Sequence, residues 1–250
     1  MMNDKYLIVI AGPTASGKTA TAITIAKALR TVIISADSRQ FYREIPIGTA
    51  APTREELSEV EHFMIHNLSI EDRYDVADYE KDVLLLLKKL FLNHDAVVMT
   101  GGSGLFIDAV CNGLDSIPDI SEETRNRVND LYEKGGVVAL QNELQHLDPE
   151  YYEIVDKQNP RRLQRAIEVC YQTGLPYSSF RKNNTKERDF KIIKLALLWE
   201  RNELITRINK RVENMISDGL VEEARSVYHK RNLNSLNTVG YKEMFQYFDG

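Results

Sequence analysis

Cysteine is scarce in this sequence, and long apolar runs are missing. Its 250 residues include two cysteines, Cys111 and Cys170, which lie far apart and fit no metal-ligand spacing. This argues against a disulfide framework and indicates reduced thiols. No run approaches the roughly 18 apolar residues that a membrane span needs, and the N-terminal run Tyr6–Ala11 is too short for a signal peptide. We therefore expect a cytoplasmic protein that does not bind membranes.

The chain also lacks an excess of positive charge. Its formal net charge is −5 and its pI is about 5.7, which by itself argues against nucleic-acid binding. Cations nevertheless gather locally. Residues 157–165 hold four cations and no acid, and residues 201–211 hold four cations and one acid. An RNA site would have to be a local basic surface on an acidic body, so charge alone leaves RNA binding undecided.

The first part of the chain alternates between strand and helix signals. Continuous apolar runs predict strands buried in a parallel sheet, and apolar residues at helical spacing predict helices between them. The strands are expected at Tyr6–Ala11, Val32–Ser35 and Ala96–Thr100, and the helices at Lys18–Arg30, Asp75–Asn93 and Leu105–Cys111. This alternation predicts an α/β fold, with a doubly wound parallel sheet flanked by helices.

The pattern changes after Gly113. Helix signals without strands continue to Gly174, in pieces at about 121–134, 137–146, 150–156 and 160–173. A strand-like run, Ile192–Trp199, then precedes two helices at Asn202–Ser217 and Leu220–Arg231. The simplest interpretation is a core formed by residues 1–117 and 188–250, interrupted by an all-helical insertion domain at 118–187.

A glycine-rich loop follows the first predicted strand. It fits the phosphate-loop (P-loop) pattern G-x-x-x-x-G-K-[ST] at every fixed position, and it consists of Gly12, Pro13, Thr14, Ala15, Ser16, Gly17, Lys18 and Thr19. In such a loop, backbone N–H groups surround phosphate oxygens at a helix N-terminus. Lys18 would place a charge on the distal phosphate, and Thr19 a hydroxyl on a bound Mg²⁺. A chance glycine turn is the alternative, and the motif does not say what the phosphates are attached to.

Asp37 lies just past the carboxyl end of the second predicted strand. Ligands of open α/β sheets bind beyond the carboxyl ends of the strands. Asp37 would therefore face the ligand of the P-loop, where it could accept a proton from an attacking nucleophile. A helix N-cap is an equally good interpretation of the same residue.

The strand Ala96–Thr100 ends in a Gly-Gly-Ser-Gly segment without a carboxylate. A P-loop nucleotidase needs an acid after such a strand to organise Mg²⁺ and water, so ATPase and GTPase functions are disfavoured. The segment could instead bring backbone amides and the Ser103 hydroxyl close to a ligand. A tight turn that requires glycine is the alternative, and both can hold.

Two groups of arginines stand out on predicted helices. Arg207 and Arg211 are four residues apart and share a face, which suits phosphate binding. Arg161, Arg162 and Arg165 open a helix and could contact RNA phosphates. A solvated charged surface is the alternative for both groups.

Six segments of the chain together resemble a known family. They are AGPTASGKT (11–19), ISADSRQFYREIPIGTAAPT (34–53), TGGSGLFIDA (100–109), NPRRLQRAIEV (159–169), RINKRVENMISDGLVEEA (207–224) and TVGYKEMFQY (238–247). In this order they resemble the tRNA dimethylallyltransferases, also called tRNA isopentenyltransferases. The P-loop alone would be generic, whereas its pairing with the DSRQ and GTA segments is highly specific.

The resemblance implies an activity and a fold. The fold would be a P-loop-type core with a helical insertion. The P-loop would hold the pyrophosphate of dimethylallyl diphosphate with Mg²⁺, and the acceptor would be the exocyclic amine of the adenosine 3′-adjacent to the tRNA anticodon. That base would be flipped out of its loop to react. Pyrophosphate would be released.

The resemblance also implies roles for individual residues. Asp37 matches the family's catalytic aspartate, Arg211 would stabilise charge on the departing pyrophosphate, and Ser103 stands where the family usually has threonine. The insertion would clasp the anticodon stem-loop. The positions that match tRNA contacts are Asp37, Ser38, Arg39, Gln40, Ser103, Arg125, Arg161, Arg162, Leu163, Gln164, Arg165, Asn237, Thr238, Val239, Gly240, Tyr241 and Lys242.

Other functions remain open at this point. A P-loop kinase for small molecules or nucleotides would use the loop with ATP, and Asp37 would activate a hydroxyl. A prenyltransferase acting on free adenine nucleotides would share the donor but not the tRNA. A non-catalytic RNA-binding module would need no reacting group at Asp37. We expect the protein to be a monomer.

Overall fold

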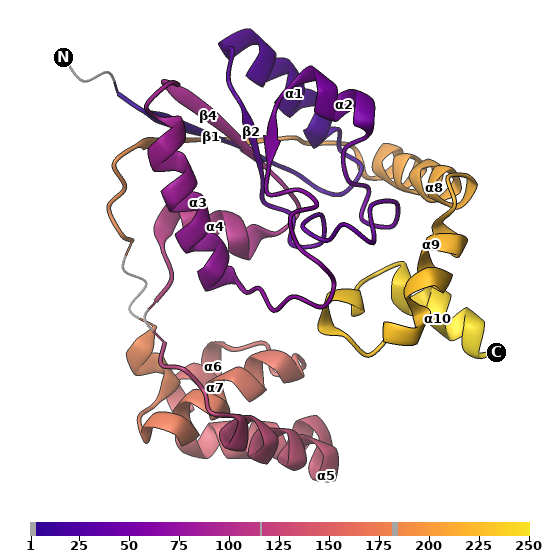
Figure 1. The fold of residues 1–250 in the computed structure, drawn as a ribbon. Helices are drawn as coiled ribbons and strands as arrows, with labels where there is room; N and C mark the ends of the chain where they lie inside the picture. Colours follow the sequence, from indigo (N-terminus) through magenta and orange to yellow (C-terminus); the bar gives the residue numbers. More distant parts are fainter. Residues whose placement is uncertain (1–3, 116, 182–184) are drawn as a thin grey trace. The chain divides into compact units, whose positions relative to one another are not determined.

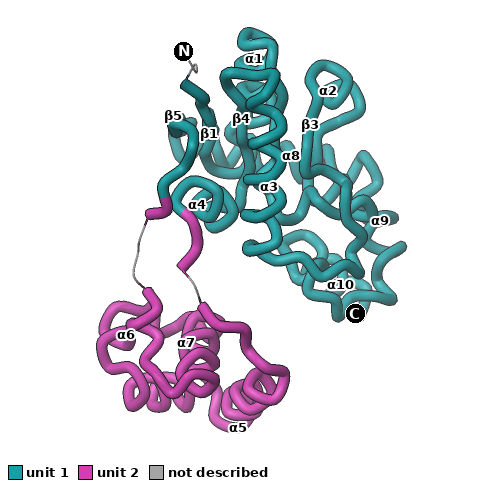
Figure 2. Tube along the Cα trace, turned by 60° about the vertical axis from the view of Figure 1, so that its left-hand side comes forward, with its two compact units in different colours: residues 1–112, 187–250 teal, residues 113–186 magenta. Residues whose placement is uncertain are grey.

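The chain folds into two compact units (Figure 2). The computed structural model describes residues 4–115, 117–181 and 185–250. The first unit joins Met1–Asn112 to Glu187–Gly250, and the second is the continuous stretch Gly113–Lys186, close to the insertion expected at 118–187. Each unit has a hydrophobic core of its own.

The first unit is built around a sheet of five parallel strands (Figure 1). Strand order across the sheet is β3-β2-β4-β1-β5. The strands are β1 (Tyr6–Ala11), β2 (Ile33–Ser35), β3 (His62–Phe63), β4 (Ala96–Thr100) and β5 (Lys191–Ala196). Because all strands run the same way, their carboxyl ends lie at one edge, where ligands bind in open α/β sheets. The expected α/β fold with a parallel sheet is confirmed.

Helices cover both faces of this sheet. Because side chains alternate along a strand, Leu7 and Val9 of β1 pack in a cluster with α3 (Val76–Leu90) and α4 (Gly104–Asn112), whereas Ile10 packs in another with α1 (Lys18–Leu29). The expected helices at these places are confirmed apart from a few residues at their ends. Helix α2 (Arg54–Glu59) and strand β3 were not expected, because elements this short show no detectable periodicity.

Helix α3 begins at a capping box and supports the end of β2. The Asp75 carboxylate accepts hydrogen bonds from the backbone N–H groups of Ala77 and Asp78, and the Asp78 carboxylate accepts one from Asp75 N–H. One turn on, the fully buried Tyr79 donates its hydroxyl to the Ser35 carbonyl oxygen (2.8 Å). The first turns of α3 thus hold the end of β2, and Asp37 follows two residues later.

Arg188 holds the returning chain against the end of α4. Its guanidinium donates to the carbonyl oxygens of Val110 (2.9 Å) and Ala109 (2.8 Å) and to the Glu80 carboxylate (2.8 Å). The side chains of Arg188 and Glu80 are 10% and 11% exposed, and each satisfies the other's buried charge. The points at which the chain leaves and re-enters the first unit are therefore held together.

The C-terminal part of the first unit is helical. It contains α8 (Arg201–Ser217), α9 (Leu220–Val227), α10 (Tyr241–Asp249) and two 3₁₀ turns, Tyr228–Lys230 and Asn234–Leu236. The single helix expected over Leu220–Arg231 is wrong at its end, because the α-helix stops at Val227. There the chain tightens into a turn, and Tyr228 packs edge-on against Phe245 and Phe248 of α10.

Glu223 of α9 ties the loop around Gly48 to the C-terminal helices. Its carboxylate accepts hydrogen bonds from the N–H groups of Ile47 and Gly48 (2.8 Å each) and from the hydroxyl of the fully buried Tyr241. Burial and the hydrogen bond to Glu223 raise the pKa of Tyr241, so the phenol stays protonated as a donor. A Cβ at Gly48 would lie 2.5 Å from the Tyr241 hydroxyl oxygen, so only glycine fits there.

Glu223→Gln should destabilise the first unit by about 2–3 kcal/mol, the usual cost of losing hydrogen bonds to a charged group. The glutamine amide would replace one acceptor oxygen with a donor that faces the N–H group of either Ile47 or Gly48, because these two groups bond to different carboxylate oxygens. The measurement is the free energy of unfolding in urea. Glu222→Gln is the matched control, since Glu222 is the exposed neighbour on the same helix. Equal stability of the two variants would contradict this account of Glu223.

The second unit is helical in its described part. Its helices are α5 (Glu122–Leu147), α6 (Pro149–Ile154) and α7 (Pro160–Thr173), followed by a 3₁₀ turn at Tyr177–Phe180. Helix α5 is interrupted at Gly136 (φ 62°, ψ −159°), so the two pieces expected on either side of Gly135-Gly136 are confirmed. Leu140, Leu144 and Leu163 form the centre of the core between α5 and α7.

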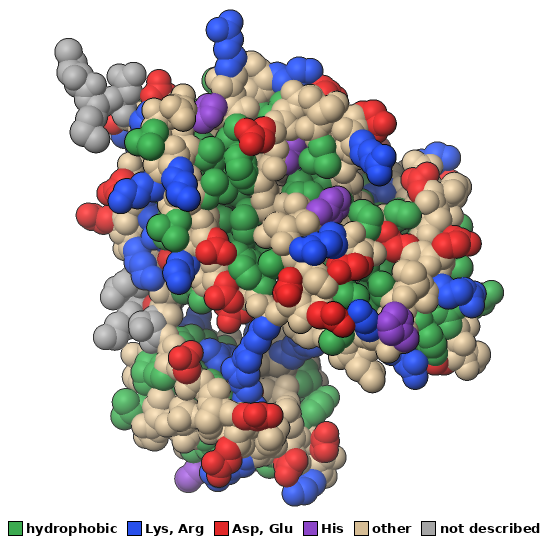
Figure 3. Space-filling view, viewed as in Figure 1, with side chains coloured by type: hydrophobic (Ala, Val, Ile, Leu, Met, Phe, Trp, Pro, Cys, Tyr) green, Lys and Arg blue, Asp and Glu red, His purple; other side chains and the backbone are tan. Residues whose placement is uncertain are grey.

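Charges of both signs are interspersed over the face shown in Figure 3. This agrees with a composition of 32 basic and 37 acidic residues. In the described ranges, no helix is long and apolar enough to cross a membrane.

Candidate active site

The P-loop runs from the end of β1 to the start of α1. Gly17 caps the helix with φ 88°, a conformation that glycine adopts without strain. The Lys18 ammonium group donates to the carbonyl oxygens of Gly12 (3.0 Å) and Pro13 (2.7 Å). The Ser16 hydroxyl is buried and has no hydrogen-bond partner among the described residues. An unpaired buried hydroxyl is costly, and a phosphate oxygen in the loop would satisfy it.

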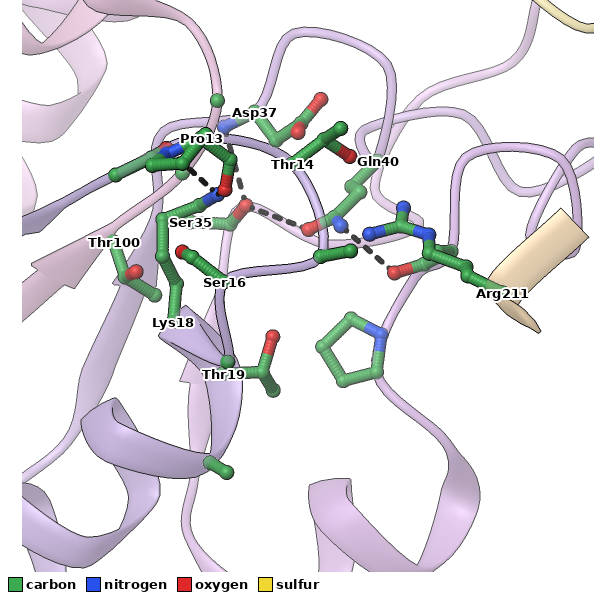
Figure 4. Close-up of a pocket in the computed structure, with 18 of the residues that line it drawn as sticks. Pro13, Thr14, Ser16, Lys18, Thr19, Ser35, Asp37, Gln40, Thr100 and Arg211 are labelled. Carbon is green, nitrogen blue, oxygen red and sulfur yellow. Dashed lines mark hydrogen bonds between the residues drawn. The ribbon is translucent and has the colours of Figure 1, made fainter. Parts of the chain in front are cut away.

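A cavity of about 980 Å³ opens in front of this loop (Figure 4). Its walls come from the P-loop, the ends of β2 and β4, and one face of α8. It therefore lies at the carboxyl edge of the sheet, as predicted for Asp37. The expected site residues that line it are Gly12, Pro13, Thr14, Ala15, Ser16, Gly17, Lys18, Thr19, Asp37, Gln40, Ser103, Arg211, Thr238 and Val239.

Asp37 follows β2 in a tight turn, not at a helix start. Its carboxylate accepts a hydrogen bond from Arg39 N–H (3.1 Å), and its carbonyl oxygen accepts one from Gln40 N–H (3.1 Å). Ser103 lies against the same turn, because its hydroxyl oxygen accepts from Ser38 N–H (3.0 Å) and its hydroxyl contacts that of Ser38 (3.0 Å). The N-cap interpretation is therefore excluded, and the carboxylate lies at the cavity wall.

The glycines after β4 allow this close approach. A Cβ at Gly101 would lie 2.2 Å from the carbonyl carbon of Ala36, and one at Gly102 would lie 3.0 Å from the Asp37 carboxylate. The expected turn that requires glycine is therefore present, whereas the contact of Ser103 with a ligand stays a prediction. The segment makes a turn that needs glycine, and it brings Ser103 to the site.

The Asp37 carboxylate interacts electrostatically with two cations, Lys18 and Arg211. Burial lowers the pKa of Lys18, while Asp37 raises it in part and Arg211 lowers it. Burial likewise lowers the pKa of Arg211, against the raising effect of Asp37. Figure 4 shows Arg211 reaching into the cavity from α8. Two partly dehydrated cations beside a loop of N–H groups form a site that favours a multiply charged anion.

The site suits Mg²⁺ only together with an anionic ligand. Thr19 lines the cavity at the first turn of α1. Among the described residues there is no group of three or more His, Cys, Asp and Glu side chains that could hold a metal ion. A magnesium ion here would have to take most of its oxygen ligands from phosphate and water, and Thr19 is the residue of the loop that would offer one more.

Arg39 and Gln40 are held by the backbone around them. Arg39 donates to the carbonyl oxygens of Asn234 (3.1 Å) and Ser235 (2.9 Å). Gln40 donates to the Ala50 carbonyl oxygen (3.0 Å) and accepts from the Ser35 hydroxyl (3.2 Å). These side chains fix the shape of the turn that carries Asp37.

The C-terminal residues that were expected to contact RNA differ in the exposure of their side chains. Val239 and Lys242 are exposed, and Asn237, Thr238 and Gly240 are partly exposed. Tyr241 is fully buried and bonded to Glu223, so its expected contact with RNA is corrected to a packing role.

The candidates in the second unit divide in the same way. Arg161 and Arg162 are exposed at the start of α7, and Arg125, Gln164 and Arg165 are partly exposed. Leu163 is fully buried between α5 and α7. Its expected contact with RNA is corrected too, because a side chain with no exposed surface cannot reach a ligand outside the unit.

Several cavity residues were missed from the sequence. Lys210 and Asn214 line the cavity together with Arg207 and Arg211. The spacing 207, 210, 211, 214 follows one face of a helix and could have identified them. His62 also lines the cavity from β3, and its Nε2 has no partner in the described part of the chain.

The strand expected over Ile192–Trp199 ends at Ala196. The following residues leave the sheet beside the P-loop, and the Trp199 indole donates to the Ser16 carbonyl oxygen (2.9 Å). Arg207 donates its Nε–H to the Ala15 carbonyl oxygen (2.8 Å). No local pattern in the sequence signals these two contacts.

Comparison with known proteins places the chain in a family. The model of the IPP transferase family (IPPT) matches residues 40–250. The tRNA dimethylallyltransferase 1 of Phocaeicola vulgatus is 54% identical over 244 residues, which cover 98% of this chain and 81% of that protein. The tRNA dimethylallyltransferase 1 of Bacteroides fragilis is 51% identical over 249 residues, covering 100% and 83%.

Solved structures of tRNA-modifying transferases are also similar to this chain. The tRNA isopentenylpyrophosphate transferase of Bacillus halodurans is 33% identical with a TM-score of 0.65, covering 99% of this chain and 78% of that one. A eukaryotic dimethylallyltransferase described as acting on tRNA is similar in fold, with a TM-score of 0.79 at 23% identity, covering 98% and 63%. The chain therefore belongs to the IPP transferase family, the tRNA dimethylallyltransferases.

Proposed function

We propose that this protein transfers the dimethylallyl group of dimethylallyl diphosphate to the exocyclic amine of the adenosine 3′-adjacent to the tRNA anticodon. The amine nitrogen attacks the allylic carbon, and the carbon–oxygen bond to the diphosphate breaks with its electrons moving to pyrophosphate. The amine proton passes to the Asp37 carboxylate. Membership of the family and the arrangement of Asp37, Lys18 and Arg211 around one cavity support this reaction.

The diphosphate binds in the P-loop. Backbone N–H groups and the Ser16 hydroxyl surround its oxygens, and Lys18 moves from its contacts with the Gly12 and Pro13 carbonyls to the phosphate. A magnesium ion held by Thr19 and the phosphates would neutralise part of the diphosphate charge. Arg211 stabilises the charge that builds on the leaving group, where fixed donors have their largest effect.

The observation that carries the proposal is the position of Asp37. It is a carboxylate at the cavity wall, in the field of the two cations that would bind the leaving group. The strand β4, after which a nucleotidase would carry its acid, ends at Thr100 and is followed by Gly101, and the Thr100 hydroxyl donates to the Ile10 carbonyl oxygen (3.2 Å). The site thus lacks the acid that an ATPase or GTPase would need after this strand.

The acceptor is a transfer RNA. Arg161 and Arg162 at the exposed start of α7, with Arg125 and Arg165, provide positive charge on the second unit for the phosphates of an anticodon stem-loop. Thr238 and Val239 line the cavity near Asp37, where the reacting base would enter. We further propose that the protein works as a monomer in the cytoplasm.

The test uses radiolabelled dimethylallyl diphosphate, Mg²⁺ and an anticodon stem-loop with adenosine next to the anticodon. AMP and ATP serve as alternative acceptors. Label is expected in the stem-loop, and replacing the reactive adenosine with guanosine should abolish it. Transfer to AMP or ATP instead would indicate a nucleotide prenyltransferase. Tight ATP binding without binding of the prenyl diphosphate would overturn the proposal in favour of a kinase.

A further inference from the structure

The segment that follows β5, together with α8, makes one contact with the end of β1 and two with the P-loop. Leu197 N–H donates to the Ala11 carbonyl oxygen (2.9 Å), the Trp199 indole N–H donates to the Ser16 carbonyl oxygen (2.9 Å), and the Arg207 Nε–H donates to the Ala15 carbonyl oxygen (2.8 Å). The first contact continues the β1–β5 pairing. The other two come from side chains and hold consecutive carbonyl groups in the middle of the loop.

These two side chains also hold each other. The Arg207 guanidinium lies over the Trp199 ring, with its central carbon 4.2 Å from the ring centroid. Such a cation–π contact restricts both side chains. Trp199 is 40% exposed, so its ring does not serve mainly as core packing. The pair instead lies against the loop, and Arg207 also lines the cavity.

The loop needs such support because its backbone is strained. Ala15 has φ 60°, in the left-handed region that residues with a Cβ rarely adopt. Backbone conformations of this kind persist only where neighbouring groups hold them. The peptide bond is planar, with its C=O and N–H on opposite sides. The Ser16 carbonyl held by Trp199 therefore turns the following N–H group, of Gly17, toward the opposite side of the loop. The Ser16 N–H, which follows the Ala15 carbonyl held by Arg207, donates to the Pro13 carbonyl oxygen (3.3 Å) and closes the turn within the loop.

Arg207 was expected as one of a phosphate-binding pair with Arg211. Arg207 does line the cavity together with Arg211, while its Nε–H donates to the Ala15 carbonyl oxygen and its guanidinium lies over the Trp199 ring. We propose that Trp199 and Arg207 are positioning residues, which act on the diphosphate through the P-loop by holding its backbone in the binding conformation. This inference rests on the proposed function of the loop as a diphosphate site.

Inorganic pyrophosphate with Mg²⁺ is the probe, and isothermal titration calorimetry measures its affinity. Trp199→Phe keeps an aromatic ring and removes the N–H donor, and Arg207→Lys keeps the charge and removes the Nε donor and the planar group. Each variant should bind pyrophosphate about five- to tenfold more weakly, the effect of about one hydrogen bond. Arg201→Lys, at the exposed start of the same helix, is the matched control and should bind like the wild type.

Kinetics separate positioning from a general structural role. In both variants the KM for dimethylallyl diphosphate should rise by a similar factor, while the KM for the RNA stem-loop and the melting temperature stay at wild-type values. A lower melting temperature with both KM values changed would indicate a purely structural role and overturn the proposal.

Trp199 also offers a direct readout, because it is the single tryptophan of the chain. Pyrophosphate should change the intrinsic fluorescence of the wild type saturably, with the midpoint found by calorimetry. A wild type that binds pyrophosphate no better than Trp199→Phe and Arg207→Lys overturns the positioning role alone. A wild type that does not bind pyrophosphate overturns the diphosphate site, and with it both proposals.

Discussion

Asp37→Asn should lower the single-turnover rate of prenyl transfer by about 10²–10⁴-fold, the range that general acid–base catalysis contributes. The asparagine side-chain oxygen can still accept the Arg39 N–H that the carboxylate now accepts at 3.1 Å, so the turn after β2 should keep its shape. Its amide cannot take the proton of the attacking amine. Rapid-quench measurement of label in the stem-loop gives the rate.

Pyrophosphate binding provides the internal control for this variant. Asp37 is a negative charge near Lys18 and Arg211, and its removal should leave pyrophosphate affinity unchanged or higher. Asp218→Asn, at the exposed end of α8, should leave rate and affinity unchanged. An Asp37→Asn variant with the wild-type transfer rate would remove the general base from the mechanism. If no form of the protein transfers label, the non-catalytic module becomes the better account.

Gly101→Ala should cost about 3 kcal/mol of stability or more, at the upper end of the range for overpacking. The new Cβ would lie 2.2 Å from the carbonyl carbon of Ala36, 2.3 Å from its oxygen and 2.6 Å from the Asp37 nitrogen. All three are backbone atoms, so the ends of β2 and β4 must separate. Transfer activity should be lost as well, because Asp37 moves with this backbone.

Substitutions at two neighbouring glycines serve as controls for this prediction. A Cβ at Gly104 would meet no atom within 4 Å, so Gly104→Ala should change stability by no more than about 1 kcal/mol. A Cβ at Gly102 would lie 3.0 Å from a carboxylate oxygen of Asp37. That contact involves a side chain, so Gly102→Ala should affect the transfer rate more than the urea midpoint. Equal stability losses at Gly101 and Gly104 would contradict the steric argument.

The central sheet and the P-loop could be predicted from the sequence because their signals are local. Strands β1 and β4 are buried on both faces and read as unbroken apolar runs, and they begin and end at the expected residues. The P-loop pattern sits between such a strand and a helix. Asp37 followed from the rule that ligands bind at the carboxyl edge of a parallel sheet.

The remaining site residues depend on contacts between distant segments. Trp199 reaches Ser16 across most of the chain length, and nothing in its neighbourhood distinguishes it from the last residue of a strand. Lys210 and Asn214 could have been found by extending the helical face of Arg207 and Arg211. Short elements such as β3 and α10 obtain their stability from packing rather than from a repeated pattern.

Motif matching also assigned too much to Leu163 and Tyr241. Both lie inside segments that resemble tRNA-contacting stretches of the family, yet both side chains are fully buried. A matched segment identifies a stretch of chain near the site. It does not tell which side chains point outward, since that depends on the packing partner of each helix.

The contacts of Arg188 have a consequence for the entropy of the chain. Arg188 lies at the start of the returning chain. It holds the end of α4 through hydrogen bonds to Val110 and Ala109, and it holds α3 through Glu80. For the first unit, the whole stretch Gly113–Lys186 is then a closed loop with fixed ends. The entropy cost of closing a loop grows only with the logarithm of its length, about 0.6 kcal/mol per doubling. We therefore expect the core to tolerate insertions of very different size at this point, so that the size of the second unit can change without a matching change in the sheet.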